Sequence, residues 1–140
     1  TPAANTIQFV TFSTTGNAVD FGDMIQVHRD HGSGGNSTRG IFCGGSGSSD
    51  QRTNVIDFIT IATLGNSIDF GDNSDANKTS QCASASSPTR MVTSGGNLDT
   101  GTVNTMHFVE IATTGNSQDF GDLQTLGEVG NAVSSGHGGL

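Results

Sequence analysis

The chain has 140 residues, a net charge of −8 and only 13% charged side chains, so its surface is acidic but carries few ions. Its five basic residues are few and scattered, which excludes a phosphate-binding surface and nucleic acid as a partner. No apolar run approaches the roughly 18 residues that a membrane span needs, and we expect one domain over residues 1–140.

Three apolar runs are rich in β-branched and aromatic residues, which predicts strands. They span residues 5–12, 54–61 and 104–111, and each begins after or at an asparagine. Both alternating faces of each run are largely apolar. We therefore expect each strand to belong to a sheet that is covered on both sides.

A Gly-Asn pair follows each apolar run and predicts a tight hairpin turn of type II′. The chain then returns through a short strand that ends in Asp-Phe-Gly-Asp, at residues 20–23, 69–72 and 119–122. Successive copies of this ending are 49 and 50 residues apart. A fixed period of this size is typical of repeat architectures.

Two more strands are predicted before each later apolar run. A strand of small residues lies near 31–35 and again near 82–86, and a further strand follows at 38–45 and at 89–96. No helical periodicity is present. The pattern predicts an all-β fold of four-stranded antiparallel units, each resembling a propeller blade in strand number and length.

The predicted units span approximately residues 5–53, 54–103 and 104–140. The chain starts at the third strand of a unit, and residues 132–140 look like the first strand of another. We expect these terminal strands to share one blade. Three blades are fewer than the four or more that propellers use, so either several copies assemble or the chain is part of a longer array.

The Gly-Gly doublets at 44–45 and 95–96, each followed by an apolar run and Asp-Phe-Gly-Asp, resemble the kelch repeat. Phe58 and Phe70 stand where kelch blades carry Tyr and Trp, although this chain has neither residue type. The pattern and the closing segment 135–140 are also similar to kelch-like repeats in large proteins of tailed phages and other aquatic viruses. This resemblance implies a virion, fibre or surface protein.

We expect the repeat to be anchored by buried aromatic residues and by glycines that permit tight backbone geometry. These anchors are Phe9, Phe58, Phe108, Phe21, Phe70, Phe120, Gly44, Gly45, Gly95 and Gly96.

Each Asp-Phe-Gly-Asp copy contains two carboxylates that could bind Ca²⁺ or act as the acid and base of a glycosidase. The alternative is that they cap nearby backbone N–H groups. Because a catalytic pair is needed once and a structural device is needed in every unit, the repetition favours the structural role. We expect no cofactor, with Ca²⁺ as the alternative. The carboxylates are Asp20, Asp23, Asp69, Asp72, Asp119 and Asp122.

Four histidines and two cysteines are candidates for metal or redox chemistry. His28 and His31 could bind a metal only with further ligands, and His107 occupies a polar strand position. Cys43 and Cys82 leave open one disulfide bond or two buried thiols.

Asn36 and Asn77 fit the pattern of N-glycosylation acceptors, which matters only if the host can glycosylate.

The expected function is a non-enzymatic structural or adhesive role on a virion, fibre or cell surface, as a homo-oligomer or with other surface proteins. The alternative is a carbohydrate-binding module that uses the loops at 25–37, 46–53, 73–81 and 97–103. These loops contain no Phe, whereas sugar sites usually need stacking aromatic rings. An enzyme that cleaves glycans is the third possibility.

Overall fold

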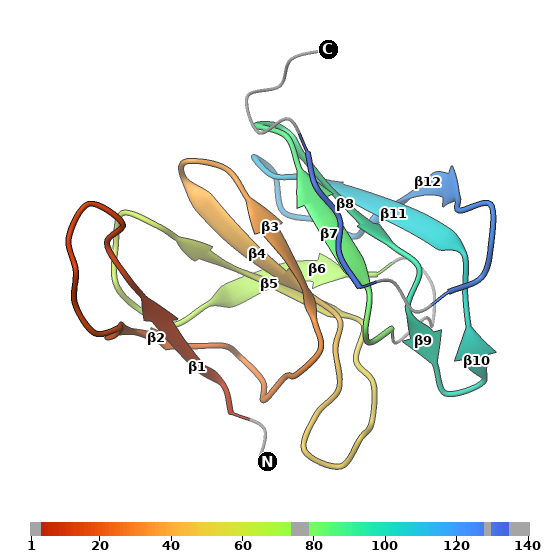
Figure 1. Ribbon diagram of the computed structural model, residues 1–140, viewed down its shortest axis with the longest axis horizontal. Helices are drawn as coiled ribbons and strands as arrows, with labels where there is room; N and C mark the ends of the chain where they lie inside the picture. Colours follow the sequence, from red (N-terminus) through yellow and green to blue (C-terminus); the bar gives the residue numbers. More distant parts are fainter. Residues whose placement is uncertain (1–3, 74–78, 128–129, 135–140) are drawn as a thin grey trace.

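The computed structural model describes residues 4–73, 79–127 and 130–134 of the chain. These residues form an all-β fold with twelve strands and no helix, which confirms the predicted secondary-structure class. Most of the strands belong to three antiparallel sheets that follow one another across the molecule, as Figure 1 shows. We call them the first, second and third sheet, in chain order.

The strands of each sheet are as follows. The first sheet consists of β1 (Thr6–Phe9) and β2 (Val19–Asp23). The second has the spatial order β3 (Gly32–Gly35), β4 (Arg39–Cys43), β5 (Val55–Thr60) and β6 (Ile68–Asp72). The third has the equivalent order β7 (Ala83–Ser86), β8 (Arg90–Ser94), β11 (Thr105–Glu110) and β12 (Gln118–Asp122). A small hairpin consists of β9 (Asn97–Leu98) and β10 (Gly101–Thr102).

The strands lie where the sequence pattern predicts them, but they are shorter than the apolar runs. The run at 5–12, for example, forms a strand only from Thr6 to Phe9. The β9–β10 hairpin lies in a segment, 97–103, that was predicted as a loop. The sequence did not indicate this hairpin because strands of two residues are too short to show any periodicity.

The three hairpins that end in Asp-Phe-Gly-Asp share one register. In each, the second Asp pairs with the first strand residue, and the following pairs skip one residue at the Phe: Phe21, Phe70 or Phe120. Such an extra residue is a β-bulge, which bends the strand and redirects a side chain. Each bulged Phe packs edge-to-face on the Phe of the partner strand, with ring centroids 5.8–6.1 Å apart.

The core lies between successive sheets, and the second sheet is covered on both faces. One cluster joins its residues Ile41, Ile56, Phe58 and Phe70 to Met91, Val109 and Ile111 of the third sheet. On its other face, Phe42 and Ile59 pack against Ile7, Phe21 and Met24 of the N-terminal part. The prediction of a sheet with two buried faces is therefore confirmed for the second sheet, where Ile56, Asp57 and Phe58 are all buried.

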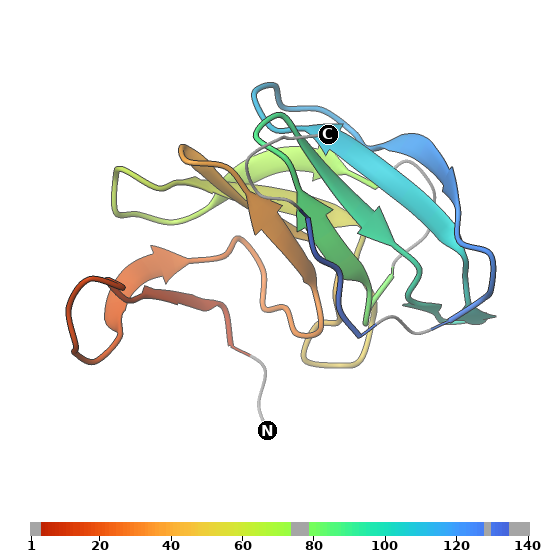
Figure 2. The same cartoon turned by 45° about the horizontal axis from the view of Figure 1, so that its top comes forward.

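The predicted sharing of one sheet by the two chain ends stays a prediction. Residues 130–134 contain no strand and lie beside β7 in both views, where the Ser134 hydroxyl donates to the Ser86 carbonyl at 2.6 Å (Figures 1 and 2). The rest of the segment in question, residues 135–140, lies outside the described residues.

The positions of the bulged phenylalanines predict unequal effects of mutation. Phe70 is 2% exposed and Phe120 is 51% exposed. Replacing Phe70 by Ala should lower the free energy of unfolding by about 3–5 kcal/mol, since it removes a buried aromatic ring. Phe120→Ala is the matched control and should cost much less in chemical denaturation. Equal losses for the two variants would contradict this account of the core.

Candidate functional site

The Gly-Asn pair of the second sheet does not form the predicted type II′ turn. Residues 61–67 separate β5 from β6, and the chain turns earlier, where Thr63 N–H donates to the Thr60 carbonyl at 3.1 Å. Gly65 instead reaches the first sheet, where its N–H donates to the Phe21 carbonyl at 2.9 Å. Ser67 N–H likewise donates to the Asp23 carbonyl at 2.8 Å. The turn prediction was wrong because the hydrogen-bonding partners of this segment lie more than 40 residues away in the chain.

The same contact is present between the second and third sheets. Gly115 N–H donates to the Phe70 carbonyl at 2.7 Å, and Ser117 N–H donates to the Asp72 carbonyl at 2.9 Å. We call residues 16–18, 65–67 and 115–117 the Gly-Asn segments. Two of these three segments therefore dock on the Asp-Phe-Gly-Asp strand of the preceding sheet.

The asparagine of each docked segment adds one side-chain hydrogen bond. Asn66 Oδ1 accepts from Asp23 N–H, and Asn116 Oδ1 accepts from Asp72 N–H, both at 3.0 Å. The backbones of Asp23 and Asp72 are thus each bound through both the N–H and the carbonyl group. This N–H would otherwise be an unpaired group on the outer edge of a sheet.

Glycine is needed where the docked backbones approach. Gly22 and Gly71 have φ angles of +150° and +147°, which side-chain-bearing residues rarely adopt. A Cβ atom at Gly71 would lie 2.5 Å from the Gly115 carbonyl oxygen, and one at Gly22 would clash with the Gly65 carbonyl. In the first two copies, the Asp-Phe-Gly-Asp motif therefore combines a bulged, buried aromatic ring with a glycine whose missing side chain leaves room for the backbone of the next sheet.

A buried carboxylate lies behind the first of these contacts. Asp57 is fully buried and accepts a hydrogen bond from the Ser67 hydroxyl. Ile25 N–H, which comes from the segment after β2, donates to Ser67 Oγ at 2.9 Å and to Asp57 Oδ2 at 3.3 Å. Asp57 occupies the same strand position as His107, which the sequence indicated only as a polar strand site. Its position in an otherwise apolar run was the available signal that it would need internal partners.

The predicted Gly-Gly anchors join the end of one strand to a loop segment later in the chain. Gly45 N–H donates to the Thr79 carbonyl at 2.7 Å, and Gly96 N–H donates to the Gly127 carbonyl at 3.4 Å. All four doublet glycines have positive φ angles between 61° and 110°. The doublets therefore let the backbone turn toward a later loop segment, which for Gly45 is the segment before the third sheet and for Gly96 is the segment after β12.

The candidate Ca²⁺ ligands do not form a closed cluster in the described part of the chain. No group of three or more His, Cys, Asp or Glu residues there has a geometry that could hold a metal ion. The first Asp of each motif is exposed. The structure places the backbone groups of the motif, rather than its carboxylates, at the contact between sheets.

His28 is a buried histidine whose two ring nitrogens have no hydrogen-bond partner among the described residues. Burial lowers the pKa of His28 below its ordinary value of 6.5, and nearby His31 lowers it further, while the Asp57 carboxylate acts in the opposite direction. The neutral imidazole is therefore the form that fits the folded chain at pH 7.

The two cysteines are free, buried thiols, so the alternative of a disulfide bond is excluded. Burial is the main reason that the pKa of Cys43 is raised to about 12. The pKa of Cys82 is also raised by burial. Because the thiolate is the reactive form, both residues serve as packing groups rather than nucleophiles.

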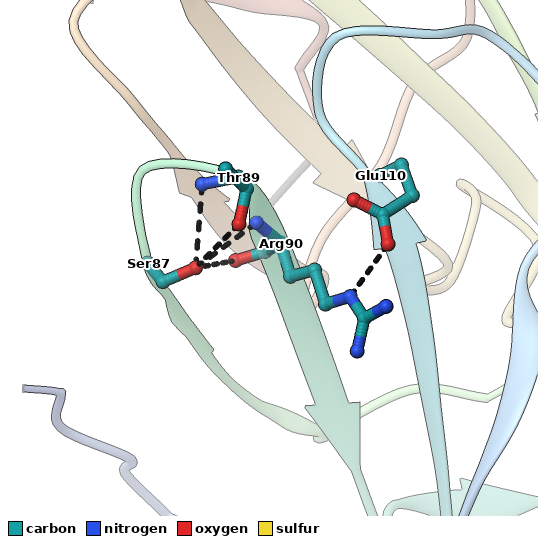
Figure 3. A network of polar contacts seen from close by, with 4 residues as sticks. All are labelled: Ser87, Thr89, Arg90 and Glu110. Atoms are coloured by element: carbon teal, nitrogen blue, oxygen red, sulfur yellow. Dashed lines mark hydrogen bonds and ion pairs between the residues drawn. The ribbon is translucent and has the colours of Figure 1, made fainter. Parts of the chain in front are cut away.

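A polar network holds the exposed turn between β7 and β8, as Figure 3 shows. Ser87 Oγ accepts from the N–H groups of Thr89 and Arg90, and Arg90 Nε donates to Glu110 Oε1 at 2.5 Å. In the second sheet Asn36 Oδ1 replaces the serine and accepts from Thr38 and Arg39 N–H. Since the Arg90–Glu110 pair is half exposed, we expect it to contribute at most about 1 kcal/mol.

Two of the four loops expected to bind carbohydrate, 25–37 and 46–53, contribute to a surface groove that residues 26–27, 47–49 and 51–55 line. Its lining side chains are polar or aliphatic and include no aromatic ring. This groove therefore lacks the stacking surface on which sugar recognition usually depends.

No family model matches this chain, and no curated protein is similar to it at a significant level. Among the described residues there is no helix of sufficient length and hydropathy to span a membrane.

Because the two sheets approach closely at Gly71, adding a single methyl group there by mutation should strongly destabilise the fold. Gly71→Ala should cost at least about 1–3 kcal/mol from backbone strain alone, with a further cost from the clash with Gly115. Gly16→Ala is the control, since a Cβ atom at Gly16 meets nothing within 4 Å. Thermal and urea denaturation measure both. A Gly71→Ala protein as stable as wild type would contradict the docking geometry.

The lowered pKa of His28 predicts acid sensitivity with a defined sign. In the unfolded chain His28 binds a proton near pH 6.5, whereas in the folded chain it does so only at lower pH. The free energy of unfolding should therefore be independent of His28 above about pH 6.5 and should decrease as the pH falls below that value. Melting temperatures between pH 7.5 and 5 measure this. His28→Leu should flatten the dependence in this window, and an unchanged slope would show that other groups cause it.

Proposed function

We propose that this chain is a non-enzymatic structural or adhesive repeat protein of a virion, fibre or cell surface that assembles with copies of itself. In this proposal the three hairpins mark three kelch-like units of the propeller-blade type. The units stack through their Gly-Asn segments and Asp-Phe-Gly-Asp strands.

The observation that carries the proposal is the recurrence of one contact between successive sheets. In the pairs Gly65–Phe21 and Gly115–Phe70, the glycine N–H donates to the phenylalanine carbonyl. In both contacts the asparagine after the glycine also accepts a hydrogen bond from the second Asp of the motif. An enzyme needs a reactive constellation once, whereas a stacking protein needs its joint at every step. The residues repeated most faithfully in this sequence are the ones that form the joint.

The surface composition supports a role in assembly rather than in binding nucleic acid. The chain carries 13% charged residues and a net charge of −8. Several large apolar side chains are also exposed, with Phe12 and Val133 almost fully so. Single exposed apolar side chains are common on any protein surface, so the relevant feature is a group of them close together in the chain, such as Val10, Phe12 and Val19.

Immunogold electron microscopy of the source material would test the proposed location. An antibody raised against the chain should label the surface of particles, fibres or cells without permeabilisation, and pre-absorption with the purified chain is the control. Labelling confined to permeabilised cell interiors would contradict the proposed surface role.

A further inference from the structure

The last Asp-Phe-Gly-Asp strand, β12, has an open docking edge. Phe21 and Phe70 are 7% and 2% exposed because the following sheet covers them, whereas Phe120 is 51% exposed. A Cβ atom at Gly121 would find its nearest neighbour, the Met106 methyl group, at 3.8 Å. At Gly71 the corresponding space is filled by the Gly115 backbone. Within the described residues, β12 therefore presents the acceptor surface without an occupant.

The first Gly-Asn segment is the matching donor without a partner. Residues 10–20 are all exposed, and Gly16, Asn17 and Ala18 make no hydrogen bond within the described part of the chain, unlike their counterparts in the docked segments. The φ angle of Gly16 lies outside the positive range that Gly65 and Gly115 adopt on docking, at +150° and +157°. The segment therefore lacks the contacts that hold residues 65–67 and 115–117 in the docked conformation.

The apolar side chains beside this donor are also uncovered. Val10 and Phe12 occupy the sequence positions of Val109 and Ile111, which in the third sheet are buried in one core cluster with Phe70. Val10 is 52% exposed and Phe12 is fully exposed. A Val10–Phe12 pair placed over Phe120 would bury apolar surface on both sides of the contact.

The donor and the acceptor lie at opposite ends of the molecule, as Figures 1 and 2 show for β1–β2 and β12. The two internal contacts run in one direction along the chain, from the Gly-Asn segment of one sheet to the Asp-Phe-Gly-Asp strand of the sheet before it. A further contact of the same kind would therefore join the Gly-Asn segment of the first sheet to the β12 strand of another copy.

We propose that the first Gly-Asn segment of one copy docks on β12 of a second copy, in the geometry of the two internal contacts. This inference deepens the proposed function and rests on it. Gly16 N–H would donate to the Phe120 carbonyl, and Asn17 Oδ1 would accept from Asp122 N–H. Ala18 lacks the hydroxyl of Ser67 and Ser117, but its backbone N–H can still donate to the Asp122 carbonyl.

The contact is heterologous, because the donor and acceptor are different surfaces of the same chain. Such contacts produce closed rings if the rotation per copy closes, and open filaments if it does not. The strong negative charge of each copy opposes association at low ionic strength. We therefore expect added salt to strengthen the assembly.

Light scattering and analytical ultracentrifugation of complementary variants test this proposal. Gly16→Val blocks the donor, since the docked segment needs a glycine conformation, and leaves the free loop unhindered. Phe120→Lys blocks the acceptor, because docking would bury the ammonium group. Gly130→Val is the matched control, as a Cβ atom at Gly130 also meets nothing within 4 Å. Circular dichroism verifies that each variant is folded.

Wild type and Gly130→Val should show a mass that rises with concentration well above the 14.3 kDa of one chain. Each blocked variant alone should stay near the single-chain mass, and their equimolar mixture should form a 1:1 dimer that grows no further. A wild-type chain that stays monomeric up to millimolar concentration would overturn the proposal.

Assembly of Gly16→Val like that of wild type would overturn the proposed interface while leaving the surface role intact. Labelling of interior structures in the immunogold experiment would instead remove the surface role and leave the interface to be judged by the variants.

Discussion

The structure depends on direct backbone hydrogen bonding between sheets that are otherwise packed through side chains. Packed sheets ordinarily lie about 10 Å apart, too far for backbone groups to meet. Here the Gly-Asn segment leaves its own sheet and the bulged strand of the preceding sheet turns toward it. The joint requires glycine at the point of closest approach, and it gives each sheet a directional contact that hydrophobic packing alone cannot supply.

This joint accounts for the unequal burial of equivalent residues. Phe21, Phe70 and Phe120 have the same sequence context, strand register and aromatic partner, yet only the first two are covered by a following sheet. Nearest-neighbour contacts of this kind are typical of repeat proteins, whose terminal repeats must be capped or paired. The structural role that we propose rests on this repeated joint.

Local patterns in the sequence were sufficient for the strands but not for the joint. β-branched and aromatic runs indicated β5 and β11 because strand preference is a short-range property. The Gly-Asn pair is a turn signal by the same local reasoning, but the partners of Gly65 and Asn66 are more than 40 residues away. The exposure of Phe9 and Phe120, both predicted as buried anchors, likewise depends on neighbours that no local pattern shows. The burial of His28 and Asp57 in one interior region also depends on such neighbours, and the sequence indicated His28 only as a possible metal ligand.

Amide hydrogen exchange measured by NMR at low protein concentration tests the joint most directly. We expect the amide protons of Gly65 and Gly115, which donate to carbonyl groups of the preceding sheet, to be protected, and that of the exposed Gly16 to exchange at the rate of an open loop. If all three Gly-Asn segments were simple hairpin turns, their glycine amides would exchange alike. Equal and rapid exchange at Gly16, Gly65 and Gly115 would contradict the central claim.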